Sequence, residues 1–452
     1  MCGILAVISK NEIPSFEFIN LLKNIQHRGQ DSCGISYIKN QQIETIKKDG
    51  LVSKLENEYN IVRSKIYLGH TRYTTSGERS FNGSNGDTGT HPIVSTFRDE
   101  TYTFIFNGNI PFISSQFNRD TEYIKNFIET RQHFDFQTVL LEFIRHVPRA
   151  FNIVFLYKNT LFAIRDKYGT RPFKCLKTKD DSKVYLSSED FFLEQESWMN
   201  FDIPEGSLTI IDNDLDIITK PTIENKPIKE TAHCVFEHIY FMNEKSMNDG
   251  FLVKDSRLKM GFILANSTDD ILDFSGDDYI VSSIPQTATT SAEVYAKTLE
   301  LEYYQFIQKN QKVNRTFIIT DSGERSNYSR EKYIIDGEKI KDKNIILVDD
   351  SIVRGTTLKT LVQILKQYSP KSIHIRVASP PITNTCNLGI DIPTKEELIY
   401  NNYNSENKLK KYLQVDSLKY LPLDGLKKIF NNKGMCMGCI NGDYNKNKLL
   451  EW

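Results

Sequence analysis

The chain has 452 residues, with 57 Lys and Arg against 58 Asp and Glu, and its formal net charge is -1. A charge this close to zero favours neither a nucleic acid nor an anionic membrane as a partner. The length predicts two or three domains, and a hydrophobic content of 39% is sufficient for packed cores.

These features favour an intracellular enzyme. No apolar run approaches the roughly 18 residues of a membrane span. The opening MCGILAVISKNE lacks the basic start and cleavage site of a signal peptide. Seven cysteines in a chain of this length do not indicate a disulfide scaffold. We therefore expect a cytoplasmic protein whose cysteines act as thiols, metal ligands or a nucleophile.

The second residue is a cysteine that directly follows the initiator methionine. If Met1 is removed, Cys2 carries a thiol and a free α-amine, and that amine is basic enough near neutral pH to accept the thiol proton. A single cysteine is more often a small buried side chain. The nucleophile hypothesis therefore depends on what the rest of the sequence supplies.

The first half alternates short strand-like and helix-like segments. The strand-like segments are rich in β-branched and aromatic residues, and they are GILAVI (3–8), YLGHTRY (67–73), TYTFIFNG (101–108), FNIVFLY (151–157), LFAIRD (161–166) and VYLSSE (184–189). The helix-like segments have apolar residues at helical spacing, and they are FEFINLLKNIQ (16–26), TEYIKNFIET (121–130) and VLLEFIRHV (139–147). The polar, proline-containing stretch DNDLDIITKPTIENKP (212–227) then predicts a boundary between residues 1–228 and 229–452.

The second half has a different pattern of predicted strands and helices. DDYIVSSIP (277–285), NIILVDD (344–350) and KSIHIRVAS (371–379) are typical of buried strands, and helical patterns lie between them. Strand–helix–strand alternation predicts a parallel, doubly wound sheet. The last fifty residues are rich in lysine and have helical patterns that end at GMCMGCINGDY.

Several segments of the first half offer partners for a thiol nucleophile. Arg72 in GHTRYTTSG suits a carboxylate. Asn107 and Gly108 in FNGN offer an amide and a backbone N–H for an oxyanion. Asp120 in RDTE, at a helix N-cap position, suits an ammonium group. Each residue alone is more often a turn or cap residue.

Together, these segments resemble class II glutamine amidotransferases, in the order CGILAVI, IQHRGQDSCGI, GHTRYTTSG, FNGN, RDTE, RDKYGTRP and SSE. The resemblance implies an α+β N-terminal-nucleophile hydrolase domain, a four-layer αββα sandwich. It also implies that Cys2 attacks the side-chain amide of glutamine and that Asn107 and Gly108 form the oxyanion hole. The groups that bind glutamine would be Arg72, Thr75 and Asp120.

A second motif, NIILVDDSIVRGTTLKTLVQIL (344–365), places two carboxylates, Asp349 and Asp350, after a buried strand and before a helix. Helix N-termini with glycine and hydroxyl residues bind phosphate, and carboxylates at a strand end bind a sugar diol or Mg²⁺. An acidic turn that caps a helix is the alternative. The candidate phosphate ligands are Ser351, Arg354, Gly355, Thr356 and Thr357.

This motif resembles the signature for 5-phosphoribosyl-1-pyrophosphate (PRPP) of α/β type I phosphoribosyltransferases, whose sheet is mainly parallel. Further matches include EHIYF (237–241), Arg257 and GIDIPT (389–394). A glutaminase domain followed by this motif resembles the amidophosphoribosyltransferase family. The resemblance implies a pentosyltransferase that makes 5-phosphoribosylamine from glutamine and PRPP, the first step of de novo purine synthesis. It also implies Mg²⁺ at Asp349 and Asp350, inhibition by purine nucleotides and a homodimer or homotetramer.

One loop departs from the family pattern. The family has Pro-Asp-Ser-Gly where this chain has Pro285, Gln286, Thr287 and Ala288. Thr287 keeps a hydroxyl for pyrophosphate and Mg²⁺, but the acidic residue and the glycine are absent. Two alternatives therefore remain open: a PRPP- or nucleotide-binding regulator without transferase activity, and an uncoupled glutaminase.

Four cysteines, Cys234, Cys386, Cys436 and Cys439, form a further candidate site. Four thiolates suit tetrahedral zinc or an iron–sulfur cluster, and spacing does not separate these. Buried thiols without a metal are the other alternative. The family resemblance implies a 4Fe–4S cluster on these four residues. Cys33 and Cys175 have no such match, and we expect them to be packing residues.

Overall fold

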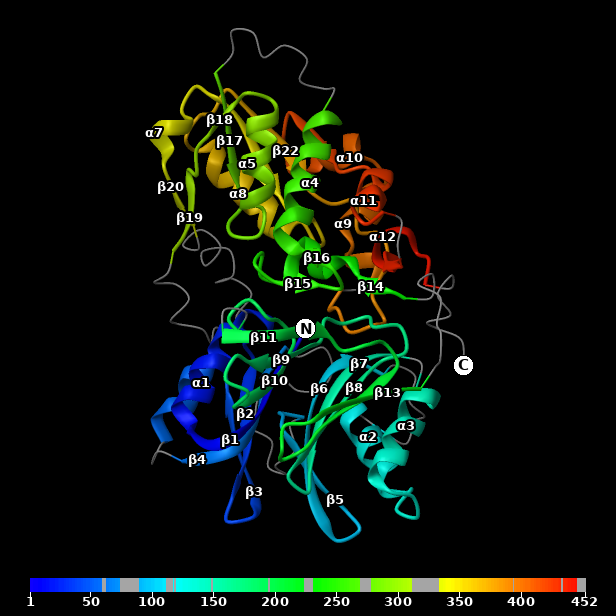
Figure 1. Cartoon of the computed structure of the whole chain (residues 1–452). Helices are drawn as coiled ribbons and strands as arrows, with labels where there is room; N and C mark the ends of the chain where they lie inside the picture. Colours follow the sequence, from blue (N-terminus) through cyan, green and yellow to red (C-terminus); the bar gives the residue numbers. More distant parts are fainter. Residues whose placement is uncertain are drawn as a thin grey trace.

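The computed structural model describes residues 1–58, 62–73, 89–110, 117, 119–147, 149–193, 196–222, 231–268, 278–310, 333–392, 394–431 and 434–444. The two halves of the chain form separate layered structures that lie against each other, and the N-terminus lies between them (Figure 1). Within these residues, no helix is both long and apolar enough to cross a membrane.

The first half contains two antiparallel sheets. One sheet has the strand order β11 (Ser197–Asp202), β9 (Lys174–Thr178), β10 (Lys183–Ser187), β1 (Gly3–Pro14), β4 (Arg63–Arg72), β2 (Ser32–Lys39) and β3 (Gln42–Asp49). The other has the order β13 (Ile217–Pro221), β12 (Ser207–Ile211), β8 (Thr160–Arg165), β7 (Ala150–Tyr157), β6 (Glu100–Asn109) and β5 (Ile93–Phe97). The helices are α1 (Ser15–Asn24), α2 (Asp120–Glu129) and α3 (Phe136–His146).

The alternation of side chains along each strand explains the layers. In β1, Ile4, Ala6 and Ile8 pack between the two sheets, while Leu5 and Val7 pack on the side of α1. The second sheet packs its other face against α2 and α3. The result is the predicted four-layer αββα sandwich (Figure 1).

The second half contains the predicted parallel sheet. Its strand order is β18 (Glu302–Tyr303), β17 (Tyr279–Ser283), β21 (Asn344–Asp349), β22 (Ser372–Val377) and β23 (Ser417–Tyr420). The helices of this half are α4 (Val253–Asn266), α5 (Thr289–Thr298), α7 (Gly337–Ile340), α8 (Thr356–Lys366), α9 (Ile399–Tyr403), α10 (Glu406–Leu413), α11 (Leu423–Ile429) and α12 (Gly438–Asn441).

Short elements complete this half and bring it against the first. A π-helix spans Glu237–Phe241. The paired short strands are β14 (His233–Cys234) with β24 (Met435–Cys436), β15 (Met247–Asn248) with β16 (Phe251–Leu252), and β19 (Ile307–Lys309) with β20 (Tyr333–Ile335). The domain boundary predicted at residues 228 and 229 falls outside the described residues.

A buried ion pair joins the two halves. Arg165, at the end of β8, donates to both carboxylate oxygens of Asp249 at 3.1 and 2.9 Å, and both side chains are almost fully buried. The other hydrogen bonds of Arg165 go to backbone carbonyls, so Asp249 is its hydrogen-bonded carboxylate partner among the described residues, while Asp202 and Glu205 add a weaker electrostatic contribution that raises the pKa of Arg165.

We predict that Asp249→Ala lowers the free energy of unfolding by about 3–5 kcal/mol, because it leaves a buried cation without a partner. Urea unfolding followed by circular dichroism measures the change. Glu100→Ala is the control, since Glu100 pairs with Lys158 on the exposed surface, and its effect should stay below about 1 kcal/mol. Equal effects of the two substitutions would contradict the prediction.

Candidate active sites

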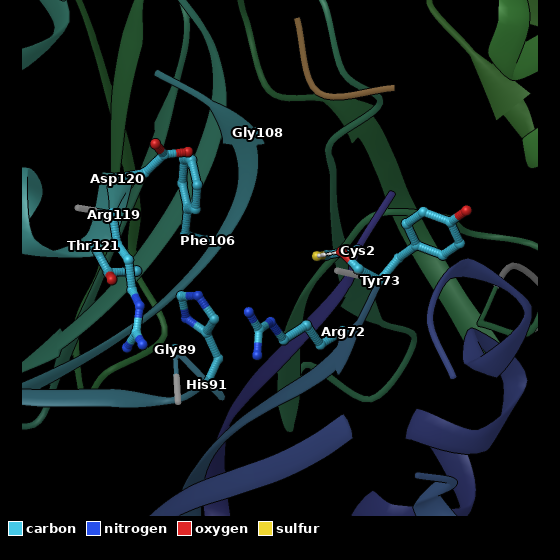
Figure 2. Close-up of a pocket in the computed structure, with 10 residues that line it drawn as sticks. All are labelled: Cys2, Arg72, Tyr73, Gly89, His91, Phe106, Gly108, Arg119, Asp120 and Thr121. Carbon is cyan, nitrogen blue, oxygen red and sulfur yellow. Dashed lines mark hydrogen bonds between the residues drawn. The ribbon is translucent and has the colours of Figure 1, made fainter. Parts of the chain in front are cut away.

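Cys2 immediately precedes β1 and lies at a small pocket of the first half (Figure 2). Its backbone N–H donates to Oδ1 of Asn107 at 3.2 Å, and its carbonyl accepts from Nε of Arg28 at 3.2 Å. Its Sγ lies 3.7 Å from the carbonyl oxygen of Tyr73. The side chain of Met1 is buried among residues of the second half, including Val235.

The end of β6 supplies the two predicted oxyanion donors. The side chain of Asn107 is buried, and its Nδ2 has no hydrogen-bond partner in the described part of the chain. A Cβ on Gly108 would lie 2.2 Å from the carbonyl oxygen of Ala150, so only glycine fits beside β7. An amide donor without a partner, close to a thiol, is suited to stabilise an oxyanion.

The predicted glutamine-binding residues lie on other walls of the same pocket. Arg72 ends β4, and Figure 2 shows it between Cys2 and Asp120 in the view. Asp120 is the first residue of α2, and the N-cap is Arg119, so the predicted N-cap position was one residue off. Burial raises the pKa of Asp120 to about 6. Thr75 lies outside the described residues.

Several pocket residues were not predicted from the sequence. His91 lines the pocket, and its ring centroid lies 4.4 Å from that of His70. Burial lowers the pKa of both imidazoles, so both rings are neutral at physiological pH. The other residues without a prediction are Tyr73, Gly89, Phe106, Arg119 and Thr121. Of these, Tyr73, Phe106, Arg119 and Thr121 stand in the recognised motifs GHTRYTTSG, FNGN and RDTE, whereas Gly89 does not.

The second half contains a larger cavity, of about 640 Å³, at the carboxyl end of β21. Asp349 ends the strand, Asp350 follows it, and α8 begins at Thr356 after the loop. Gly355 has a φ of 71°, and a Cβ there would lie 2.3 Å from Cδ1 of Ile399. The predicted phosphate ligands all line this cavity, namely Ser351, Arg354, Gly355, Thr356 and Thr357.

The altered loop also reaches this cavity. Thr287 lines it, and the Thr287 hydroxyl donates to Oδ2 of Asp350. Ser351 donates to the other carboxylate oxygen, Oδ1, at 2.7 Å. Burial raises the pKa of Asp350. The structure thus brings Thr287 to the acidic pair, as its assignment to the same site requires.

The two cavities are neighbours. Tyr73 lines both of them, and its hydroxyl donates to Oδ2 of Asp391 in the second half at 3.3 Å. The wall of the larger cavity also contains residues of the first half, including His27, Arg28 and Asp31. The two cavities therefore share part of their walls.

The four predicted metal-ligand cysteines come from three separate segments. Cys234 lies directly opposite Cys436 in the parallel pair β14–β24, and Cys439 lies on α12. All four thiols are free, and burial raises the pKa of Cys234, Cys436 and Cys439. No three of their sulfurs lie within 4.8 Å of one another among the described residues. The cysteines therefore do not form a closed tetrahedral zinc site in this structure, since such a site would hold its sulfurs about 3.8 Å apart.

In contrast to the cysteines, Glu205, His233 and Asp249 have side-chain ligand atoms that all lie within 4.8 Å of one another. Both Asp249 oxygens already accept from Arg165, and Nε2 of His233 lies 2.8 Å from Oε1 of Glu205. This group is therefore an ion-pair network between the two halves.

Comparisons with known proteins cover the whole chain. Residues 258–380 match a phosphoribosyl transferase domain family. The chain is 32% identical to an amidophosphoribosyltransferase of Pyrococcus horikoshii (98% of this chain, 96% of the relative). It is 30% identical to the corresponding proteins of Methanocaldococcus jannaschii (98% and 97%) and Homo sapiens (100% and 98%).

A solved structure extends the likeness to three dimensions. The glutamine PRPP amidotransferase of B. subtilis, complexed with ADP and GMP, aligns with a TM-score of 0.84 at 25% identity and covers 98% of this chain and 97% of its own. The chain thus shares its fold and the order of its two halves with this structure, and its sequence matches the amidophosphoribosyltransferases along nearly the full length. The chain belongs to the amidophosphoribosyltransferase family.

Proposed function

We propose that the chain transfers ammonia from glutamine to C1 of PRPP, giving 5-phosphoribosylamine, glutamate and pyrophosphate. One observation carries the proposal: a thiol pocket and an acidic, phosphate-type cavity lie side by side and share Tyr73. Family membership supports the same reaction. This reaction begins de novo purine synthesis, and we place the protein in the cytoplasm.

In the first half, Cys2 is the nucleophile. Removal of Met1 gives its α-amine, which accepts the thiol proton while Sγ attacks the side-chain amide carbon of glutamine. Asn107 Nδ2 and the Gly108 N–H stabilise the oxyanion. As the intermediate collapses, the α-ammonium group of Cys2 gives its proton to the amide nitrogen, and the C–N bond breaks to release ammonia and leave a glutamyl thioester. Water then hydrolyses the thioester to glutamate and the free thiol of Cys2.

Substrate orientation follows from the same pocket. Cys2 and Asp120 lie on opposite sides of it in Figure 2, and the reactive amide and the α-amine lie at opposite ends of glutamine. Asp120 binds the α-ammonium group, and Arg72 binds the α-carboxylate, with Thr75 assisting.

In the second half, the N-terminus of α8 binds the 5-phosphate. Asp349 and Asp350 bind the ribose hydroxyls, and Thr287 contacts the pyrophosphate. The ammonia lone pair forms a bond to C1 as the bond from C1 to pyrophosphate breaks, and pyrophosphate takes the electron pair. Mg²⁺, held through Asp349, Asp350 and Thr287, would neutralise charge on the leaving group.

We also propose a 4Fe–4S cluster on Cys234, Cys386, Cys436 and Cys439. Four free, mostly buried thiols from three segments, two of which lie opposite each other in the β14–β24 pair, support this assignment together with the family membership. The cluster would hold β14, α12 and the Cys386 segment together, and its role is structural.

Purine nucleotides are the proposed inhibitors, since the B. subtilis relative is complexed with ADP and GMP. The proposed assembly is a homodimer or a homotetramer. Within each chain, we propose a domain boundary between residues 228 and 229.

Glutamate release from glutamine tests the coupling. We expect anaerobically prepared protein to release glutamate at least tenfold faster with PRPP and Mg²⁺, and mass spectrometry to show that Met1 is absent. Cys2→Ala should abolish this release but keep phosphoribosylamine formation from ammonium salts. Release that is indifferent to PRPP would instead indicate an uncoupled glutaminase, and PRPP binding without either reaction would indicate a regulator.

The raised pKa of Asp120 predicts a pH effect on glutamine binding. Because the ionised carboxylate binds the substrate ammonium group, KM for glutamine should rise about tenfold per pH unit below the pKa of about 6. Steady-state kinetics between pH 5 and pH 8 measure this dependence. A flat KM across that range would contradict the assignment.

Asp120→Asn should raise KM for glutamine at pH 8 by about a hundredfold. The same substitution should raise the free energy of unfolding of the protein without substrate. The folded pKa lies above its usual value, so the ionised carboxylate destabilises the fold above pH 6, and this penalty disappears as the pH falls towards 4. We expect a gain of about 1–2 kcal/mol at pH 8 and a smaller one at pH 4 by urea unfolding. A loss of stability at pH 8 would show that the contacts of the Asp120 carboxylate outweigh the free-energy cost of burying its charge.

The cysteine assignment predicts iron binding by all four residues. Anaerobic protein should contain about four iron atoms per chain, with visible absorbance typical of an iron–sulfur cluster. Cys386→Ser should lower both, whereas Cys175→Ser should change neither, because Cys175 is a buried residue of the first half. Zinc in place of iron would overturn the assignment.

A further inference from the structure

A buried charge cluster joins the nucleophile to the second half of the chain. It contains Arg28 and Glu189 from the first half and Glu237 from the second, and all three side chains are 0% exposed. Arg28 donates through Nη1 to Glu189 at 2.7 Å and through Nη2 to Glu237 at 2.9 Å. Its Nη1 also lies 3.2 Å from the second oxygen of Glu237, which makes that contact bidentate.

The remaining donor of Arg28, Nε, contacts the carbonyl oxygen of Cys2. Cys2 becomes the first residue once Met1 is removed, so no preceding peptide bond orients it. Its backbone is then held by Asn107 at the nitrogen and by Arg28 at the carbonyl. The direction of the thiol therefore depends on where the guanidinium of Arg28 lies.

A bidentate carboxylate fixes a guanidinium in both position and plane. Glu189 alone does not do this, because its carboxylate also contacts His27, the N–H of Asn243 and the hydroxyl of Ser246. Glu237 is the partner that contacts both terminal nitrogens of Arg28. Arg171 lies further away, with Nη1 3.9 Å from Oε1 of Glu237.

Glu237 begins the π-helix Glu237–Phe241, and this element also forms part of the larger cavity. Tyr240 and Phe241 line that cavity, while Arg257 on α4 donates to the carbonyls of His238, Tyr240 and Met242. One short, firmly held element thus contributes to the PRPP cavity and holds the arginine that orients Cys2.

We propose that Glu237 is a positioning residue for glutamine hydrolysis, acting across the boundary between the halves through Arg28 on the backbone of Cys2. This inference rests on the proposed function. It assigns to the second half a residue that the chemistry of the first half requires, although Glu237 lies 209 positions from Arg28 in the sequence.

The test is Glu237→Gln, which keeps the size of the side chain but removes its charge. Product formation is measured with glutamine and, separately, with ammonium salts, which bypass Cys2. We expect kcat with glutamine to fall ten- to a hundredfold, KM for glutamine to stay within threefold, and the ammonia reaction to stay within twofold. Alkylation of Cys2 by iodoacetamide should slow by a comparable factor.

Glu205→Gln is the matched control. Glu205 also contacts the other half, through Nε2 of His233 at 2.8 Å, but it has no contact with Arg28 or Cys2 among the described hydrogen bonds. Glu205→Gln should leave the ratio of kcat with glutamine to kcat with ammonium salts unchanged. For Glu237→Gln, equal losses in both reactions, or no loss in either, would overturn the inference. A wild-type protein inactive with both nitrogen donors would overturn the proposed function instead, and this inference with it.

Discussion

The proposed mechanism depends on holding Cys2, the proposed nucleophile, in place after the removal of Met1. A terminal residue is tethered on one side only, and fraying is the usual state of such residues. Here the backbone of Cys2 is fixed by Asn107 from β6 and by Arg28, whose side chain is fully buried. The two sheets of the first half and the docked second half are what bring these contacts to one place.

Burying charges between the halves is costly, and the cost is offset only by full pairing. Arg28 and Arg165 are both enclosed at this boundary, and each contacts two carboxylate oxygens from the other half. Such pairs favour one docking geometry, because a shifted docking would remove the bidentate carboxylate partner of both arginines, and Arg28 would retain only Glu189 of its own half. The boundary therefore fixes the distance between the two cavities as well as the stability of the chain.

Local signals in the sequence predicted individual strands and helices and singled out the motif residues, whereas the four-layer arrangement was predicted from the family resemblance. Apolar periodicity defines β1, α2 and α8, and Asp349 and Asp350 follow a buried strand directly. Gly89 and His91 carry no such signal, and Glu237 stands in the matched segment EHIYF without any sign of its contact with Arg28. Their importance comes from which strands and loops become neighbours, and short-range patterns do not encode contacts between residues 28 and 237.

The burial of Met1 has a consequence for how the protein matures. Met1 is buried, and the other buried members of its hydrophobic cluster all belong to the second half. The proposed removal of Met1 by an aminopeptidase would therefore have to precede docking of the halves, while the nascent chain is still emerging or unfolded. Folding and processing are then in competition, and a molecule that docks first retains a blocked amine for as long as it stays folded. Very rapid expression should accordingly yield a correctly folded but catalytically silent fraction.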